Sequence, residues 1–334
     1  MKTLNVFFLG IFALLAVSCG NISNENMPKP GATGKIGEIL VIIDDNQWNS
    51  EIGDTIRAIF QASYPMLPQP EPYFKLLNIG NSSFLPVMQK HRNILLISLT
   101  SEEPEAKLTI SRDLWAKPQI VLNAVGANAH DIAKIISDKR KTMLGLYEQA
   151  ELDRQQTSTE VYSDAKLEQA IVERFGINLN VPSGYYIMRN DEDFMWLESQ
   201  SNHNSMGVFI YTYPFVDDST FTLKFQLSKR DSILKEKVPG SRDSSWMTTT
   251  KFLLPDFEIK EYKGLTYGEM RGLWELVNDY MGGPFVNHSY LDRAKGRVIN
   301  VEGYVYAPRF DKRDYVRRML GIINTFSLEP KPRE

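Results

Sequence analysis

RVINVEGYVYAPRFDKRDYVRRML, residues 297–320, has the pattern of a strand, a short connection and a helix. In its first part Ile299, Val301 and Val305 alternate with polar or aromatic residues, which is the period of a β-strand with two different faces. Further on, apolar residues recur at helical spacing, and we expect Asp311 to cap this helix. The stretch therefore predicts a sheet packed by a helix at this end of the chain.

The second face of this strand is polar and aromatic. Residues 285–291 are expected to pair with it as an antiparallel hairpin, with Asn287 beside Glu302 and Ser289 beside Asn300. The candidate binding face then consists of Asn287, Ser289, Asn300, Glu302, Tyr304 and Tyr306. Rings beside amides and carboxylates are typical of surfaces that bind glycans or peptides, and a half-solvated antiparallel sheet has the same pattern. Both interpretations stay open.

Outward from this stretch, the chain divides into a first half in which strands and helices alternate and a second half rich in strands. In the first half, strands are expected at residues 37–44, 73–79, 93–99 and 119–125, with helices at 52–60 and from Asn128 to about residue 155. In the second half, strands are expected at 184–188, 194–198, 208–213, 257–262 and 266–277, after a helix that Ser163 caps and Gly176 ends. Residues 221–238 fit both periods, and we predict a helix.

These patterns predict an α+β protein, mixed α/β in character, with two lobes of mixed or antiparallel sheet packed by helices. The expected division is an N-terminal lobe of residues 37–160 and a C-terminal lobe of residues 161–328. Residues 119–136 repeat the plan of the opening stretch, which favours a duplicated unit, although strand-loop-helix units are also common without duplication. Duplication requires the same strand order in both lobes.

The amino terminus has the pattern of a lipoprotein signal peptide. Lys2 precedes an apolar run of about a dozen residues, which is too short to cross a bilayer as a helix. Small residues then lead to Cys19, the only cysteine in the chain. We expect residues 1–18 to be removed, Cys19 to carry acyl chains that hold the protein on a membrane, and residues 19–36 to form a flexible tether. An ordinary secretory signal with a chance cysteine is the alternative.

Composition and motifs exclude several classes of protein. The formal net charge of the 334 residues is −3 and the cations are scattered, so we expect no nucleic-acid partner. The histidines that a metal site would need are His91, His130, His203 and His288. They lie far apart and lack zinc-binding spacing, so we expect no metal. The serine-nucleophile turn and the glycine-rich nucleotide motifs are absent, and we expect no cofactor.

A resemblance to a known family rests on motifs in the last third of the chain. They are Gly272-Leu273-Trp274, Met281-Gly282-Gly283-Pro284-Phe285, Val301-Glu302-Gly303, Tyr306-Ala307-Pro308 and Lys312-Arg313. On these motifs the chain resembles domain-of-unknown-function family 4837, a family of Bacteroidetes lipoproteins. The resemblance implies a lipid-anchored envelope protein and no assigned activity. Surface-exported lipoproteins of this kind often carry an acidic run after the cysteine, and here only Glu25 is present, so we expect the periplasmic face of the outer membrane.

Two functions stay open, beside a purely structural role. The first is a non-catalytic binding or assembly factor of the cell envelope, with an envelope protein or glycan as its partner. The second is a glycan or peptidoglycan hydrolase with Glu275 or Glu302 as the acid and Asp292 as its partner. Paired carboxylates do this work only at separations of about 5 to 9.5 Å in a cleft. Because catalytic motifs are missing, we favour the binding protein over the enzyme.

Overall fold

The computed structural model describes residues 28–201 and 203–329. The predicted signal peptide, Cys19 and the first part of the predicted tether lie outside the described residues. The rest of the tether is attached to the body, because Ala32 N donates to Lys117 O at 3.0 Å and Thr33 N to Lys90 O at 2.8 Å. The prediction of a flexible tether up to residue 36 is therefore wrong for its last residues, where the backbone finds hydrogen-bond partners on the first lobe.

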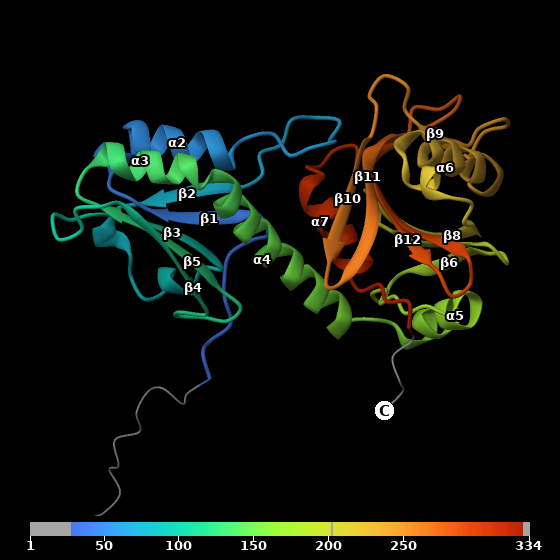
Figure 1. Cartoon of the computed structure of the whole chain (residues 1–334), viewed down its shortest axis with the longest axis horizontal. Coiled ribbons are helices and arrows are strands. Elements are labelled where there is room, and N and C mark those ends of the chain that lie inside the picture. The colour runs from blue at the N-terminus through green and yellow to red at the C-terminus, as the bar shows by residue number, and fades with distance from the viewer. Residues whose placement is uncertain (1–27, 202, 330–334) are drawn as a thin grey trace, which may run out of the picture.

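The first lobe is built on a five-stranded sheet in the order β2-β1-β3-β5-β4 (Figure 1). Its strands are β1 Glu38–Ile42, β2 Lys75–Ile79, β3 Asn93–Leu99, β4 Lys107–Arg112 and β5 Ile120–Gly126. β4 is antiparallel to its neighbour and the other pairs are parallel. The helices are α1 Asp45–Trp48, α2 Glu51–Phe60, α3 Ala129–Asp138 and α4 Arg140–Val161, with short turns η2 Asn81–Ser83 and η3 Met88–Lys90. Parallel pairs need the crossovers that these helices supply.

The two faces of the first sheet are covered differently. One face packs its aliphatic side chains against α2, α3 and the first part of α4, and Phe60 and Tyr147 meet edge to face there. The other face, which carries Leu40 and Ile42, has no α-helix over it among the described residues and is covered by loop residues that include Phe84 and Trp115. The lobe therefore has two layers and a thin second side.

The second lobe is an antiparallel sheet in the order β10-β11-β12-β13-β8-β7-β6, with β9 beside β11. Its strands are β6 Tyr186–Asn190, β7 Phe194–Gln200, β8 Ser205–Pro214, β9 Met247–Thr249, β10 Asp256–Tyr262, β11 Leu265–Leu276, β12 Gly282–Asp292 and β13 Arg297–Tyr306. Its helices are α5 Ala165–Phe175, α6 Leu223–Lys237 and α7 Arg313–Ile323, with the turn η4 Asp218–Phe221. α5 and α7 pack on one face and α6 on the other, so both faces are buried.

The predicted hairpin and its register are confirmed: Asn287 lies opposite Glu302 and Ser289 opposite Asn300. The helix predicted within residues 221–238 is α6. The two sheets differ in strand order and in parallel content, so the prediction of a duplicated unit is wrong. The two similar strand-loop-helix patterns therefore belong to sheets of different topology.

Helix starts show where local signals failed. Asn128 caps α3 as predicted, since its side chain accepts from Asp131 N at 3.0 Å, but the helix ends at Asp138 and α4 starts anew. Asp164, and not Ser163, caps α5. Asp311 does not cap α7; the Glu71 carboxylate of the first lobe accepts from the first backbone N–H groups of α7 at 2.6 and 2.9 Å. A distant carboxylate has replaced the local cap.

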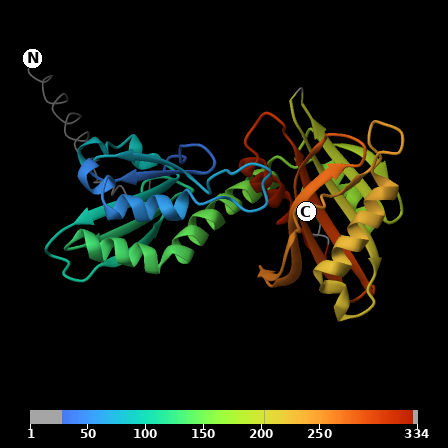
Figure 2. The same cartoon turned by 90° about the horizontal axis from the view of Figure 1, so that it is seen from above.

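The lobes are joined by α4, which has 22 residues and runs from the first sheet to the second lobe (Figure 2). It packs against α7, and Gly321 permits the approach, since an added Cβ would lie 2.7 Å from the Cβ of Gln155. The Arg317 guanidinium of α7 also pairs with Glu148 of α4 and donates to Tyr73 O at 2.7 Å. No helix among the described residues has both the length and the apolar character that a membrane span requires.

Candidate functional site

The predicted binding face lies inside the second lobe. Glu302 is fully buried, and its oxygens accept from Arg230 Nε at 2.9 and 3.0 Å and from Arg230 Nη2 at 2.7 Å. Asn287 Nδ2 donates to Glu302 at 3.2 Å and to Tyr211 at 2.9 Å. Burial raises the pKa of Glu302, and the adjacent Arg230 opposes that rise. Because α6 covers this face, the prediction that it is a solvent-facing binding surface is wrong.

The other members of that face are also enclosed, with one exception. Ser289 and Asn300 are fully buried, and Ser289 Oγ donates to Gly268 O at 3.1 Å. Tyr304 is buried against Phe209, with ring centroids 4.9 Å apart. Tyr306 is half-buried and lines a cavity of about 460 Å³ at the end of the sheet. The six residues therefore share a sheet face as predicted but form core.

The three predicted catalytic carboxylates are not brought together. Glu302 and Trp274 share the face under α6, whereas Glu275, the residue after Trp274, projects to the other face. Asp292 is an odd number of residues from Asn287 on the same strand, so it also projects away from Glu302, and it accepts from Arg297 Nε at 2.9 Å. The predicted pair of Glu302 with Asp292 does not form, because strand alternation separates the two side chains. The predicted pair of Glu275 with Asp292 does not form either, because Glu275 lies opposite Gly282 at the start of β12, whereas Asp292 is the last residue of that strand.

A different site lies where the lobes meet. A cavity of about 510 Å³ is lined by three arginines from separate elements: Arg92 just before β3, Arg154 on α4 and Arg318 on α7. We call it the arginine pocket. Hydroxyl groups of Ser158 and Thr159 also line it. Its apolar side is formed by Ile36, Met206, Met319 and Ile322.

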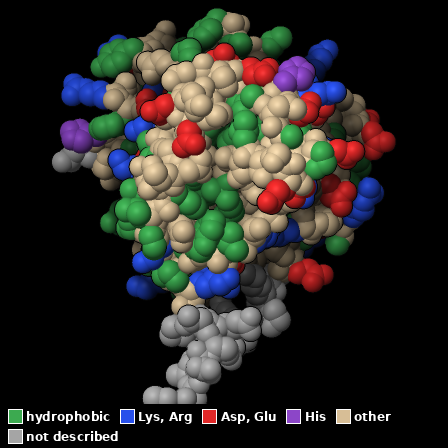
Figure 3. Space-filling model, turned by 90° about the vertical axis from the view of Figure 1, so that its left-hand side faces the viewer, with side chains coloured by type: hydrophobic (Ala, Val, Ile, Leu, Met, Phe, Trp, Pro, Cys, Tyr) green, Lys and Arg blue, Asp and Glu red, His purple; other side chains and the backbone are tan. Residues whose placement is uncertain are grey.

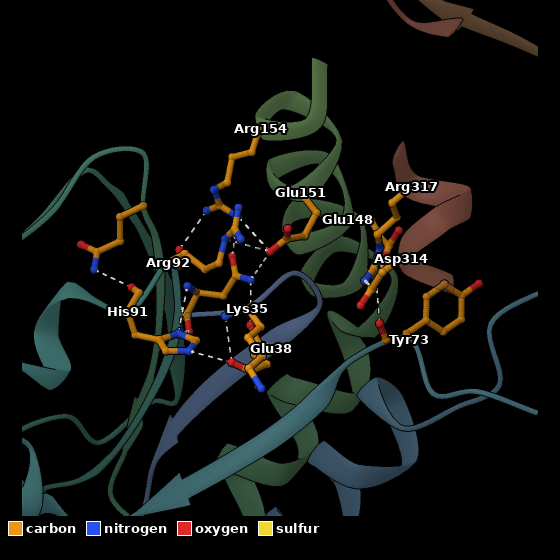
Figure 4. Close-up of polar contacts among 12 residues, drawn as sticks. Lys35, Glu38, Tyr73, His91, Arg92, Glu148, Glu151, Arg154, Asp314 and Arg317 are labelled. Atoms are coloured by element: carbon orange, nitrogen blue, oxygen red, sulfur yellow. Dashed lines mark hydrogen bonds and ion pairs between the residues drawn. The ribbon is translucent and has the colours of Figure 1, made fainter. Parts of the chain in front are cut away.

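Arg154, which lines the arginine pocket, is held by several hydrogen bonds (Figure 4). Its Nη1 donates to Asn93 Oδ1 at 3.0 Å and to Glu151 Oε1 at 3.1 Å, and its Nη2 donates to Arg92 O at 2.9 Å. Asn93 Nδ2 in turn donates to the same Glu151 oxygen at 2.7 Å. Burial lowers the pKa of Arg154 to about 10. These contacts fix the orientation of the guanidinium before any ligand arrives.

Positive charge exceeds negative charge in the arginine pocket. Glu151 is the one described carboxylate within ion-pair distance of Arg92 or Arg154, at 3.4 and 3.1 Å. The buried Arg154 Nε has no hydrogen-bond partner among the described residues, and the buried Arg92 Nε has only its 3.4 Å ion pair with Glu151. Arg318 is exposed and forms no ion pair with any of the described residues. Three guanidinium groups against one carboxylate make this pocket a candidate site for an anion.

A second cavity between the lobes, of about 380 Å³, is lined by Glu148, Glu269 and Arg271. Glu269 accepts from Lys260 Nζ and Arg271 Nε, both at 2.6 Å, and lies 3.0 Å from His288 Nε2. Burial favours the protonated form of Glu269, but Arg271 and His288 hold its pKa well below the ordinary range. Burial lowers the pKa of His288. In this second cavity the Glu269 carboxylate is therefore already neutralised by neighbouring cations.

Sequence reasoning missed the arginine pocket. Glu151 and Arg154 stand three residues apart, which is the spacing of an ordinary surface ion pair on a helix. Nothing near Arg92 or Arg318 in the sequence indicates a ligand, since the site arises from the contact between lobes. His288, which the sequence marks only as lacking zinc-binding spacing, is buried beside the Glu269 carboxylate. Across residues 28–201 and 203–329, no group of three or more potential metal-ligating side chains is found.

Comparisons with known proteins agree with the division seen in the fold. Residues 32–160 match the model of Domain of unknown function (DUF8532), and residues 164–325 match Domain of unknown function (DUF4837). The chain therefore contains both domains. No curated protein matches.

Two solved structures are similar to part of the chain. The Saccharomyces cerevisiae Ran-binding protein Mog1p aligns with a TM-score of 0.31 and 9% identity, over 46% of this chain and 89% of that chain. A mutant of protein Mog1 aligns with a TM-score of 0.27 and 10% identity, over 46% of this chain and 90% of that chain. Neither similarity is close enough to support an inference about function.

Proposed function

We propose that this chain is a lipid-anchored, non-catalytic binding protein of the bacterial cell envelope, and that its arginine pocket binds an anionic ligand. The anchor is supported by the sequence alone, in which an apolar run and small residues precede the single Cys19. We place the protein on the periplasmic face of the outer membrane, in the manner of the Bacteroidetes lipoproteins that it resembles.

One observation carries the binding proposal. Arg92, Arg154 and Arg318 line one cavity between the lobes, and Glu151 alone among the described carboxylates opposes them at ion-pair distance. A protein gains little from holding guanidinium groups together without counter-charges, because like charges repel and desolvation is costly. A bound carboxylate or phosphate supplies the missing charge through hydrogen bonds that are stronger than those between neutral groups.

The remaining lining defines the ligand further. Ile36, Met206, Met319 and Ile322 provide apolar surface next to the cations, and Ser158 and Thr159 provide hydroxyl groups. The cavity of about 510 Å³ lies within the range of small-molecule sites, about 300 to 1,000 Å³. The expected ligand therefore has an acidic group joined to a less polar body, which describes a lactyl-bearing sugar or a short acidic peptide of the envelope.

Calorimetric titration of the mature chain tests this proposal. The probes are N-acetylmuramic acid, inorganic phosphate and the neutral sugar N-acetylglucosamine. We expect N-acetylmuramic acid to bind, the neutral sugar not to bind, and Arg318→Ala to weaken binding by about tenfold, as loss of a charged hydrogen bond predicts. Arg140→Ala is the matched control, since Arg140 is exposed on the same helix as Arg154 and contacts only Ser137 O. Equal affinity in both variants, or no binding of either anion, contradicts the proposal.

The anchor is tested separately by growth with a labelled fatty acid. We expect the wild-type chain to carry the label and the Cys19→Ser chain to lose it. Persistence of the label after that substitution contradicts lipidation at Cys19.

The alternative of an envelope glycan hydrolase is favoured by one observation, although not with the carboxylates expected from the sequence. Glu148 and Glu269 line the same cavity, and their pKa values shift in opposite directions. Burial raises the pKa of Glu148, while Arg271 and His288 hold that of Glu269 low, which is the division found between a general acid and its ionised partner. Both oxygens of Glu269 already have partners, Oε1 with Lys260 and Arg271 and Oε2 with His288, so we rank this function second.

Peptidoglycan digestion distinguishes the two functions. An enzyme releases soluble fragments from purified sacculi, and both Glu148→Gln and Glu269→Gln abolish that release while Glu236→Gln, an exposed control on α6, does not. No release by the wild-type chain removes the hydrolase and leaves the binding protein.

A further inference from the structure

An apolar patch lies on the side of the first lobe that no helix covers. It consists of Phe84, Leu85, Val87, Met88, Leu114 and Trp115, and we call it the tether-side patch. Phe84 and Trp115 are half-buried and meet edge to face, with ring centroids 5.5 Å apart. Three other side chains of the patch are exposed to solvent: Leu85 is 57% exposed, Val87 63% and Met88 41%. Figure 3 shows apolar side chains gathered on this end of the molecule.

The described chain begins in the middle of this patch. Thr33 N donates to Lys90 O at 2.8 Å, two residues after Met88. On the other side, Lys117 N donates to Pro30 O at 2.9 Å, and Lys29 Nζ donates to the backbone oxygen of Asp113, the residue before Leu114. The first described residues therefore run between the two halves of the patch. The chain that carries Cys19 therefore joins the body on this side of the molecule.

The length of the preceding chain limits how far away that attachment can be. Nine residue steps separate Cys19 from Pro28, and a fully extended chain covers at most about 3.6 Å per step, or roughly 32 Å in all. A body anchored through Cys19 thus stays within one lobe diameter of the lipid surface. The face nearest to the anchor is the face that meets the headgroups most often.

Charge at the rim of the patch suits a bilayer surface. Lys29, Lys90 and Lys117 are all exposed and lie beside the apolar side chains. Lysines attract anionic headgroups, while leucine, valine and tryptophan side chains insert at the boundary between headgroups and acyl chains. The position of the predicted anchor therefore favours a bilayer over a soluble protein as the occupant of this patch.

We propose that the tether-side patch docks on the lipid bilayer that holds Cys19, with Leu85, Val87 and Met88 inserted into the headgroup region. This inference rests on the lipid anchor of the proposed function and adds a second, non-covalent contact. Docking sets the first lobe against the membrane and orients the second lobe, with its share of the arginine pocket, away from it.

Site-specific fluorescence on the acylated full chain tests docking. Cys19 is consumed by lipidation, so Val87→Cys supplies the only free thiol for an environment-sensitive dye. Val216→Cys, on the second lobe, is the matched control, because Val216 is 69% exposed and Val87 63%. In vesicles of phosphatidylethanolamine and phosphatidylglycerol carrying a headgroup-proximal spin label, we expect the Val87→Cys dye to be quenched about twofold and the Val216→Cys dye to be unaffected.

The outcomes separate docking from anchoring. Mass spectrometry of the preparation first shows whether acyl chains are present, and their absence overturns the anchor itself. With acyl chains present, equal quenching at the two labels overturns docking and leaves the anchor intact. Shielding of the Val87→Cys dye in detergent without vesicles assigns the patch to a second copy or to the chain's own residues, and also overturns docking.

A label-free measurement keeps the inference testable if the dye perturbs the patch. The Cys19→Ser chain lacks the anchor, so its flotation with the same vesicles reports the patch alone. We expect Leu85→Ser combined with Val87→Ser to lower that vesicle binding by at least about tenfold, since two apolar side chains are lost. Unchanged flotation of this variant contradicts docking.

Discussion

The arginine under α6 and the arginines of the arginine pocket differ in how completely they are paired. Under α6, all three guanidinium nitrogens of Arg230 have acceptors, on Glu302 or Thr249, and the cation stacks 3.7 Å from the Phe285 ring. Between the lobes, Arg154 also has firm partners, but its Nε has none and a cavity lies beside it.

This difference separates structural charges from charges available to a ligand. A buried ion pair whose hydrogen bonds are all made needs nothing further, and it can be exchanged for apolar side chains with little loss. A cluster with excess positive charge and an adjoining cavity is stabilised by an added anion. Sequence patterns pointed to the first cluster as the site, and the geometry points to the second.

The largest expected effect tests the completeness of the pair under α6. Glu302→Ala leaves the Arg230 charge buried without its partner, and we expect the free energy of unfolding to fall by about 3 to 5 kcal/mol. Replacing both residues, as Arg230→Met with Glu302→Leu, should restore most of that loss. Urea denaturation of both variants measures it. A loss below about 1 kcal/mol for Glu302→Ala would show that water reaches the pair.

The next effect concerns the cluster between the lobes. Arg154→Met removes the donors to Asn93 Oδ1 and Arg92 O, and we expect a loss of about 1 to 3 kcal/mol. The loss should be smaller than that of Glu302→Ala, because the cavity lets water replace the donors. The same denaturation curves give the answer. A loss equal to that of Glu302→Ala would mean that water is excluded equally from both groups of charges.

A third prediction weakens the contact between lobes without touching either arginine cluster. Glu71→Ala removes the acceptor of the first N–H groups of α7, and we expect a loss of about 1 to 2 kcal/mol, as for other helix caps. Asp311→Ala should have little effect, since Asp311 does not cap the helix. Thermal unfolding of the two variants compares them directly. A larger loss for Asp311→Ala than for Glu71→Ala would mean that Asp311 is the cap of α7 after all.

The smallest effect is a pH dependence that separates the His288 network from the Glu302 pair. Burial lowers the pKa of His288 below 6.5, so the unfolded chain binds the proton more readily and stability falls as pH drops below about 6.5. For one such histidine the loss between pH 6.5 and 5.5 is at most about 1 kcal/mol. The raised pKa of Glu302 acts in the opposite sense, since the folded state then binds its proton more readily.

Comparison with His288→Gln isolates this contribution, because Glu302 and all other groups are common to both chains. We expect the variant to have a flatter stability profile between pH 7 and 5.5 in denaturant titrations. Parallel profiles would mean that His288 keeps its ordinary pKa in the folded state.

Much of the fold followed from local pattern. Period-two alternation located the hairpin of β12 and β13 with its register, and the Asn128 cap and the left-handed Gly176 marked helix ends. These features depend on neighbours within a few residues, so a sequence contains them. β4 and β9 were missed because a polar edge strand and a three-residue strand carry little pattern.

The candidate site could not be predicted from the sequence, because it depends on residues that are distant along the chain. Alternation told that Asn300 and Glu302 share one side of a strand, but not that α6 covers that side. Likewise, the cap of α7 comes from Glu71 in the other lobe, and no local signal records it. Burial and pairing depend on which elements pack together.

By itself the sequence determined most of the elements, the pairing of the last hairpin, the α+β class and the amino-terminal pattern that predicts a lipoprotein, because each depends on residues close together along the chain. Only the tertiary structure decided which polar face is core and where Arg92, Arg154 and Arg318 meet. Those three residues come from segments far apart in sequence, and the packing of α4 against α7 is what brings them to one cavity.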